Sequence, residues 1–216
     1  MGKVVRICCY RNVKVTEGEK MCRKLVLDIR KKKKNVEDMP DRAKEILEYF
    51  NIKDFSEGVP IIDILKKMGF KIFQSNLEPD GLSAYIAVDP KFEEVFESNK
   101  ITCVHAKDNI GHKRFALAHE LAHYLFDFDE DRSLYYYDTY FANGSIDKFE
   151  EERANAFAAN LLMPADIFWK KYKEFEALQS KAEIVSALSR YFRVSATAVM
   201  KRFPEVGIEG YTTLEK

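Results

Sequence analysis

The sequence predicts an α+β fold that is mostly helical, with a small β-sheet beside one central helix. Residues 115–126 contain neither proline nor glycine and are apolar on almost every side, which is typical of a buried helix. Two short segments, 82–88 and 101–106, are rich in strand-forming residues. The content of 46% hydrophobic and 32% charged residues fits a soluble protein with a substantial core, and no stretch approaches the length of a membrane span.

The N-terminal half is expected to contain a hairpin, two helices and a group of strands. The hairpin is expected to pair residues 3–16 with residues 23–30 across Glu17 and Gly18. The helices are expected at residues 40–51 and 60–68, and the strands at residues 70–73, 82–88 and 101–106. Gly69 ends the second helix, and the last two strands are expected to pair.

The C-terminal half is expected to be helical apart from one polar, tyrosine-rich loop at 127–145. The central helix begins near Asp108 or Asn109, and a second long helix ends before Pro164. Two short amphipathic helices follow within residues 181–203.

Two histidines four residues apart are the strongest functional signal. His119 and His123 flank Glu120 in the helical run, so both imidazoles lie on one face, one turn apart. Two imidazoles placed in this way can bind one zinc ion, and the glutamate can reach a water molecule on the metal. The alternative is a surface helix with this spacing by chance, which the apolar flanks disfavour. The sequence therefore predicts a Zn²⁺ site with Glu120 as the catalytic base.

The third protein ligand is expected on the next long helix. The apolar stripe of that helix, projected back one turn, meets Glu151, with Asn155 between. A carboxylate on a buried stripe needs a partner, and Zn²⁺ provides one. Asn155 is then placed to orient one of the histidines through a hydrogen bond. Glu150 and Glu152 remain alternatives, and all three glutamates can also be interpreted as a solvated acidic first turn.

The two helices together resemble the ImmA/IrrE family of zinc metallopeptidases. That family pairs an HExxH helix with a helix of the form E-x-x-A-N-x-F-A-x-x-L-L-M-P, which residues 151–164 match at every fixed position. The likeness covers about residues 37–205, and the first glutamate of the family motif falls on Glu151. One departure is Ala122, where the family often has glycine, but alanine is the better helix former and leaves the metal undisturbed. The resemblance implies a zincin-like fold.

The resemblance also implies a cytoplasmic, site-specific endopeptidase. Its substrate would be a helix-turn-helix transcriptional repressor, whose cleavage switches on a mobile element or stress genes. In the expected mechanism, Glu120 takes a proton from the attacking water and delivers it to the leaving amine. The alternative is a non-catalytic regulator that keeps the zinc fold and binds a repressor or DNA, for which Glu120 would not be needed. Direct nucleic-acid binding is not favoured, and no membrane partner is expected.

Two further expectations concern substrate binding. An extended peptide is expected to pair, as an added strand, with residues 82–88 or 101–106. The tyrosines of the loop between the two long helices are candidates to stabilise the oxyanion, although packing is the commoner role for any one of them: Tyr135, Tyr136, Tyr137 and Tyr140.

The chain is expected to divide into a basic extension (1–36), a peptidase domain (37–205) and a short tail (206–216). Residues 1–34 carry twelve Lys and Arg against three acids, a net charge of +9 that leaves −9 for the remainder. Such an arm can bind nucleic acid or an acidic partner, but a solvated extension is the favoured interpretation. The four cysteines include no CxxC pair, so reduced thiols in a cytoplasm are expected.

The last two predicted helices, within residues 180–203, resemble a helix-turn-helix unit around Arg193, Val194 and Ser195. DNA contact is one interpretation. Packing of the pair on the peptidase core is favoured, because the body of the chain is acidic and lacks a strong basic footprint. His112 lies on the face of the metal ligands but about 10 Å away, too far to join the same ion.

Overall fold

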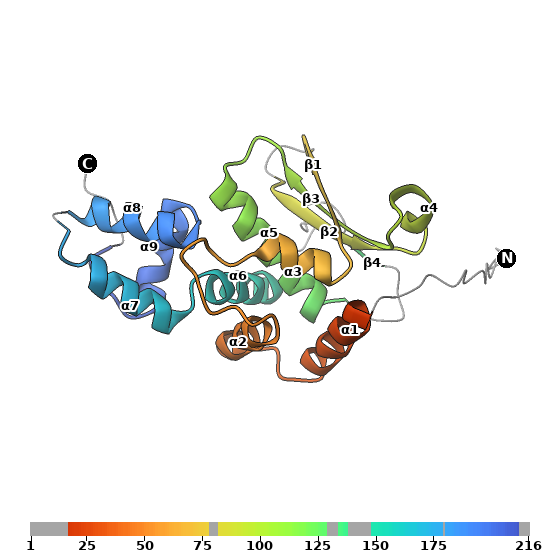
Figure 1. Cartoon of the computed structure of the whole chain (residues 1–216), viewed down its shortest axis with the longest axis horizontal. Helices are drawn as coiled ribbons and strands as arrows, with labels where there is room; N and C mark the ends of the chain where they lie inside the picture. Colours follow the sequence, from red (N-terminus) through yellow and green to blue (C-terminus); the bar gives the residue numbers. More distant parts are fainter. Residues whose placement is uncertain (1–16, 78–81, 129–133, 138–147, 179, 212–216) are drawn as a thin grey trace.

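The computed structural model describes residues 17–77, 82–128, 134–137, 148–178 and 180–211. It has the α+β, zincin-like architecture expected from the sequence. Helix α5 (Ile110–Phe126) lies between a small mixed β-sheet and a layer of helices that includes α6 (Lys148–Leu162) (Figure 1). No helix among the described residues has both the length and the apolar character needed to cross a membrane.

The remaining described elements surround α5 and α6. The other α-helices are α1 (Glu17–Arg30), α2 (Met39–Tyr49), α3 (Ile61–Lys67), α4 (Phe92–Phe96), α7 (Ala165–Phe175), α8 (Lys181–Phe192) and α9 (Ala196–Glu205). The strands are β1 (Lys71–Ser75), β2 (Ala84–Val88), β3 (Lys100–His105) and β4 (Leu134–Tyr137). The sequence did not predict α4, α7 or β4, whereas the helical pair α8 and α9 occupies the expected segment.

The four strands are arranged in the order β1-β3-β2-β4. Strand β3 runs parallel to β1 and antiparallel to β2, which confirms the predicted pairing of segments 82–88 and 101–106. Because β3 has a neighbour on both sides, the expectation that it accepts a substrate strand is wrong. Strand β2 is also paired on its other side, by β4 along residues 85–88, so it is not an open edge there either. The sequence missed this because β4 comes from the segment interpreted as a loop.

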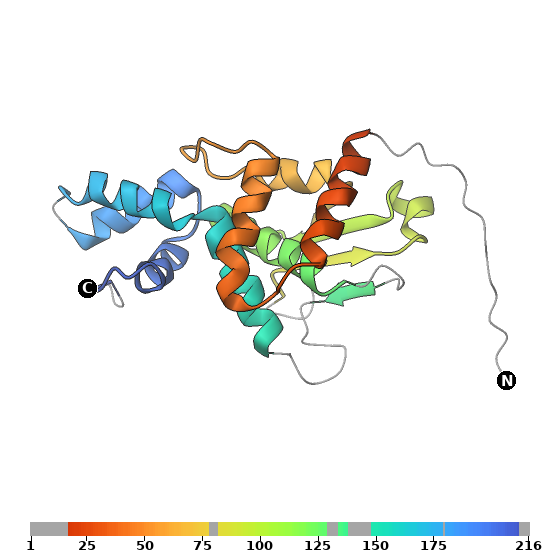
Figure 2. The same cartoon turned by 90° about the horizontal axis from the view of Figure 1, so that it is seen from below.

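The predicted N-terminal hairpin is wrong, because residues 23–30 belong to helix α1. Cys22, Val26 and Ile29 fall at helical spacing and are buried in the main hydrophobic core. Figure 2 shows α1 crossing the face of α5, which it contacts. Residues 3–16 lie outside the described part of the chain. Part of the segment expected to be a basic extension therefore packs against the helix that carries the two histidines.

Two basic residues of this segment bind the C-terminal end of α5. Arg30 donates from Nη2 to the carbonyl of Tyr124 at 2.7 Å, and Lys34 donates from Nζ to the carbonyl of Phe126 at 2.9 Å. The last four carbonyls of a helix have no partner within the helix, and its C-terminus carries partial negative charge. The two cations therefore stabilise α5 at the end nearest His123.

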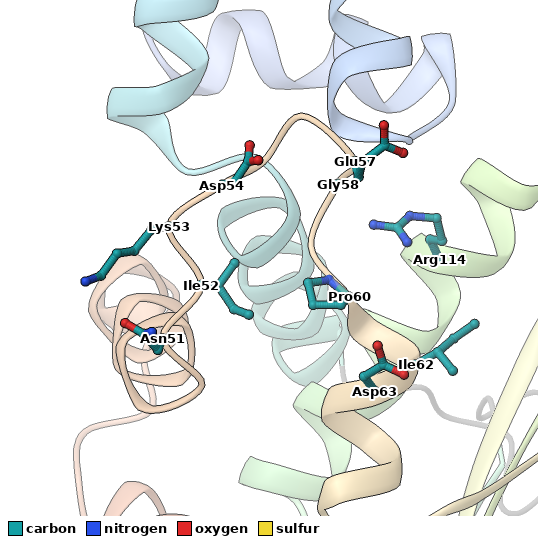
Figure 3. A pocket seen from close by; sticks show the side chains of 10 residues that line it. All are labelled: Asn51, Ile52, Lys53, Asp54, Glu57, Gly58, Pro60, Ile62, Asp63 and Arg114. Carbon is teal, nitrogen blue, oxygen red and sulfur yellow. The ribbon is translucent and has the colours of Figure 1, made fainter.

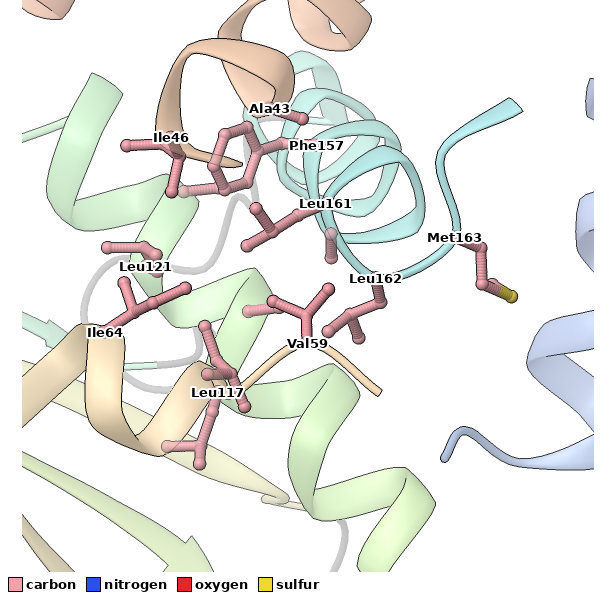
Figure 4. Packing of buried hydrophobic residues seen from close by; sticks show 14 of the residues in the cluster. Ala43, Ile46, Val59, Ile64, Leu117, Leu121, Phe157, Leu161, Leu162 and Met163 are labelled. Atoms are coloured by element: carbon pink, nitrogen blue, oxygen red, sulfur yellow. The ribbon is translucent and has the colours of Figure 1, made fainter. Parts of the chain in front are cut away.

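In the core, α6 packs against both α5 and α2. Leu117 and Leu121 of α5 are buried in one cluster with Phe157 and Leu161 of α6, and Ile46 of α2 lies beside Phe157 (Figure 4). Phe157 is fully buried and contacts the ring of Phe126 edge-on, with centroids 5.4 Å apart. This packing fixes the position of α6 relative to the two histidines.

Candidate metal centre

The polar side chains in the second half of α5 are largely buried. The side chain of Asn109 caps the helix by accepting from the backbone N–H of His112 at 2.9 Å. Ten residues further along the helix, His119 is partly exposed, whereas Glu120 is 3% exposed and His123 is fully buried. Buried polar groups are costly unless they are paired, so these side chains require partners in the fold.

Helix α6 supplies a carboxylate to the two imidazoles. The Nε2 atoms of His119 and His123 are 2.9 Å apart, and each lies 3.3 Å from a carboxylate oxygen of Glu151. All three potential ligand atoms lie within 4.8 Å of one another. Of the three candidate glutamates, the structure brings only Glu151 into this cluster, while Glu152 is exposed and 3.5 Å from Lys148.

The outer nitrogen of each imidazole is bound by an oxygen acceptor. Nδ1 of His119 lies 3.2 Å from Oδ1 of Asn155, and Nδ1 of His123 lies 2.7 Å from Oδ2 of Asp127. The carboxylate of Asp127 only accepts, so His123 donates from Nδ1, and the Asn155 oxygen favours the same tautomer in His119. In the neutral imidazoles both Nε2 lone pairs therefore face each other, which is unfavourable unless a cation lies between them.

The electrostatics of the cluster also favour positive charge at the imidazoles. Burial lowers the pKa of His123, but its hydrogen bonds with Asp127 and Glu151 outweigh burial and raise the pKa to about 9. Hydrogen bonds with His119 and His123 hold the pKa of Glu151 well below its usual range, although burial opposes this shift.

The residues present fit a zinc ion. Tetrahedral Zn²⁺ with bonds of about 2.0–2.1 Å places its ligand atoms roughly 3.3 Å apart, close to the separations of the three side chains here. Two imidazoles and one carboxylate form a donor set typical of catalytic zinc. The cluster also has the outer hydrogen bonds that orient the imidazoles of metal sites.

Sequence reasoning anticipated Asn155 but missed Asp127. Asp127 lies four residues after His123, so the signal was the same i,i+4 spacing that identified the histidines. It went unnoticed because it lies just past the end of α5, where a loop was expected. Asp127 is itself held by an ion pair with Arg153 of α6, whose Nη1 donates to the carbonyl of Lys34 at 3.3 Å. The basic segment is therefore linked to His123 through this network.

The cluster opens into a cleft of about 740 Å³. His119, Glu120 and Glu151 line it, and so does His112, whose Nε2 is 2.8 Å from the hydroxyl of Ser83. His112 thus belongs to the cleft, although it is not one of the clustered ligands. The backbone of Tyr135–Tyr137 forms β4, and Tyr140 lies outside the described residues.

A second depression, of about 590 Å³, lies beside the loop between α2 and α3. Arg114 of α5 reaches toward this loop, as Figure 3 shows, and donates to the carbonyl of Val59 at 2.5 Å. None of the predicted site residues line this depression.

Comparison with known proteins agrees with the geometry. A family model described as the IrrE N-terminal-like domain, peptidase M78, matches residues 65–203. No curated protein matches the chain. Among solved structures, a Mycobacterium tuberculosis transcriptional regulator is similar, with 15% identity, a TM-score of 0.48, and coverage of 87% of this chain and 52% of that chain. The chain thus spans about half the length of that structure. The family match includes both segments that carry the clustered residues and covers more than half of the chain, which therefore belongs to the IrrE N-terminal-like family, peptidase M78.

Proposed function

We propose that the chain is a zinc-dependent, site-specific endopeptidase that holds Zn²⁺ through His119, His123 and Glu151. The observation that carries the proposal is the convergence of these three ligand atoms within 4.8 Å beside a cleft that His119, Glu120 and Glu151 line. We further propose that the substrate is a helix-turn-helix repressor whose cleavage relieves repression of a mobile element or stress genes. The family resemblance supports this substrate class.

The mechanism follows from the positions of the side chains. Zinc, when bound, supplies a Lewis acid that activates water and polarises a peptide carbonyl. Asn155 and Asp127 keep the Nε2 atoms of the two imidazoles turned inward, where a cation is held. Glu120 accepts the proton of the attacking water and delivers it to the leaving amine. Burial of Glu120 restricts bulk water around its carboxylate.

Metal content tests the ligands. Elemental analysis of purified wild type, His119→Ala and Glu151→Ala is expected to give one zinc per wild-type chain and strongly reduced zinc in both variants. Glu152→Ala is the control, because the Glu152 carboxylate lies outside the cluster and is largely exposed. If the wild-type protein takes up no zinc under gentle loading, the metal site is refuted. That result would favour the non-catalytic regulator that binds a repressor or DNA.

Cleavage tests the reaction. The zinc-loaded protein is incubated with a helix-turn-helix repressor encoded beside it, and products are read by mass spectrometry. Wild type is expected to cut at one site, and Glu120→Gln to bind zinc but lose about 10²- to 10⁴-fold in rate. Equal cleavage by wild type and Glu120→Gln would refute the base assignment. A repressor that is bound but never cut would identify a non-catalytic regulator.

A further inference from the structure

One wall of the cleft comes from the helix that a helix-turn-helix unit would use to read DNA. Helix α9 follows α8 through a turn, and residues from the turn and the helix line the cleft: Ser195, Thr197, Ala198, Lys201 and Glu205. A recognition helix must protrude from its protein to enter the major groove. Here the same face is turned toward the clustered ligands of α5 and α6.

Helix α9 is fixed to both ligand-bearing helices. At Gly111 of α5, an added Cβ would lie 2.6 Å from the backbone of Val194 and of Ser195, so the turn before α9 packs directly on the α5 backbone. On the other side, the buried Arg202 donates to the carbonyl of Met163 at 3.1 Å and to Oδ1 of Asn160 at 2.7 Å. The α9 wall is therefore part of the cleft and keeps a set position relative to the metal ligands.

Lys201 is a cation on this wall for which the described residues supply no counter-ion. Its natural partner on the helix would be Glu205, one turn further on. Arg202 binds Glu205 instead, with Nη1 and Oε2 2.9 Å apart. Among the described residues, Lys201 has no ion-pair partner within 4 Å, and its side chain is exposed.

We propose that α9 is a substrate-recognition wall and that Lys201 receives an acidic side chain of the bound peptide. This inference rests on the proposed peptidase function. Along α6, the residues from Glu151 to Ala159 that line the cleft span roughly 12 Å at 1.5 Å per residue, and Lys201 of α9 lines the same cleft. An extended peptide covers roughly 12 Å with about four residues, so the cleft has room for an acidic side chain a few residues from the cleaved bond.

Peptide binding to the uncleaving Glu120→Gln protein tests the inference without relying on turnover. The probe is a fluorescein-labelled random decapeptide library, divided into pools with Glu, Ala or Lys fixed at one position. The zinc-loaded protein is expected to retain the Glu pool about two- to fivefold better than the Ala pool, the range for a partly exposed ion pair. Adding Lys201→Glu is expected to reverse the preference toward the Lys pool.

The control is Lys170→Glu, which makes the same charge change at an exposed lysine of α7 that does not line the cleft. Reversal in Lys201→Glu alone supports the inference. No preference for the Glu pool, an unchanged preference in Lys201→Glu, or an equal effect of Lys170→Glu would overturn it. Duplex DNA binding that only Lys201→Glu abolishes would also overturn it and assign α9 to DNA.

Failure of the two proposals is distinguishable. If zinc-loaded wild type cuts neither the retained peptides nor the repressor, the peptidase function fails, while the charge reversal still establishes that α9 selects peptides. If wild type cuts the peptides but Lys201→Glu leaves the preference among the peptide pools unchanged, only the recognition role of Lys201 is refuted.

Discussion

Replacing Gly111 by alanine should destabilise the protein, although the same change usually stabilises a helix. Alanine gains about 0.8–1.0 kcal/mol over glycine in a helix interior, which is an upper bound at Gly111, the second residue of α5. The new Cβ would lie 2.6 Å from backbone atoms of both Val194 and Ser195, and backbone cannot rotate away as a side chain can. Overpacking of this kind costs about 1–3 kcal/mol, and direct backbone contact puts the cost at the upper end. The expected net loss is therefore about 1–2 kcal/mol.

Thermal unfolding followed by circular dichroism, at a fixed zinc concentration, measures this loss. For a chain of this size, about 1–2 kcal/mol corresponds to a fall in Tm of roughly 2–8 °C. The neighbouring Ile110→Ala is the matched control, because Ile110 is 61% exposed and its replacement should change stability by less than about 0.5 kcal/mol. A Tm of Gly111→Ala equal to or above that of wild type would refute the close packing of the α8–α9 turn on α5.

Three further substitutions test the network around the clustered residues. Asp127→Ala should weaken zinc binding about 10- to 100-fold, because His123 loses the acceptor that orients its ring. Competition with a chromophoric chelator measures the zinc affinity, and an unchanged affinity would contradict this role of Asp127. Arg202→Ala should lower the free energy of unfolding by about 2–4 kcal/mol, since the buried carbonyl of Met163 and the half-buried amide oxygen of Asn160 lose a charged donor. Lys201→Ala should change little in the same urea titration. Lys34→Ala should cost about 0.3–2 kcal/mol by removing a cation from the end of α5, and the exposed Lys33→Ala, with no such contact, should have no comparable effect in thermal unfolding.

Local geometry made the centre of the site predictable. The spacing of His119 and His123 places both imidazoles on one helix face whatever the rest of the fold does. The buried stripe of α6 likewise favoured Glu151, with Glu150 and Glu152 left as alternatives, and the structure brings Glu151 to the imidazoles. The short strands β2 and β3 were visible because their residue types favour extended backbone.

Long-range packing accounts for most of what was missed. Cys22, Val26 and Ile29 carry helical spacing, but Val26, Leu27 and Ile29 also suit a strand, and only burial against α5 decides between them. The α9 wall requires glycine at position 111, because the backbone of Val194 and Ser195 packs directly on it. These residues are more than eighty positions away in the sequence, so no local pattern indicates the contact. Pairing of β4 with β2 also depends on a distant segment, so a loop was the default interpretation of that stretch.

If the proposed zinc site is occupied, the contacts of Arg30 and Lys34 with the end of α5 link the N-terminal segment to the metal thermodynamically. If docking of α1 favours the arrangement of α5 that binds zinc, then bound zinc must favour docking of α1 by the same factor. Removal of residues up to 36 would therefore change metal affinity without touching a ligand. A binding partner that displaces the basic segment from α5 would have the same effect. The fraction of protein with bound zinc would then depend on whether Arg30 and Lys34, which lie outside the cleft, are docked on α5.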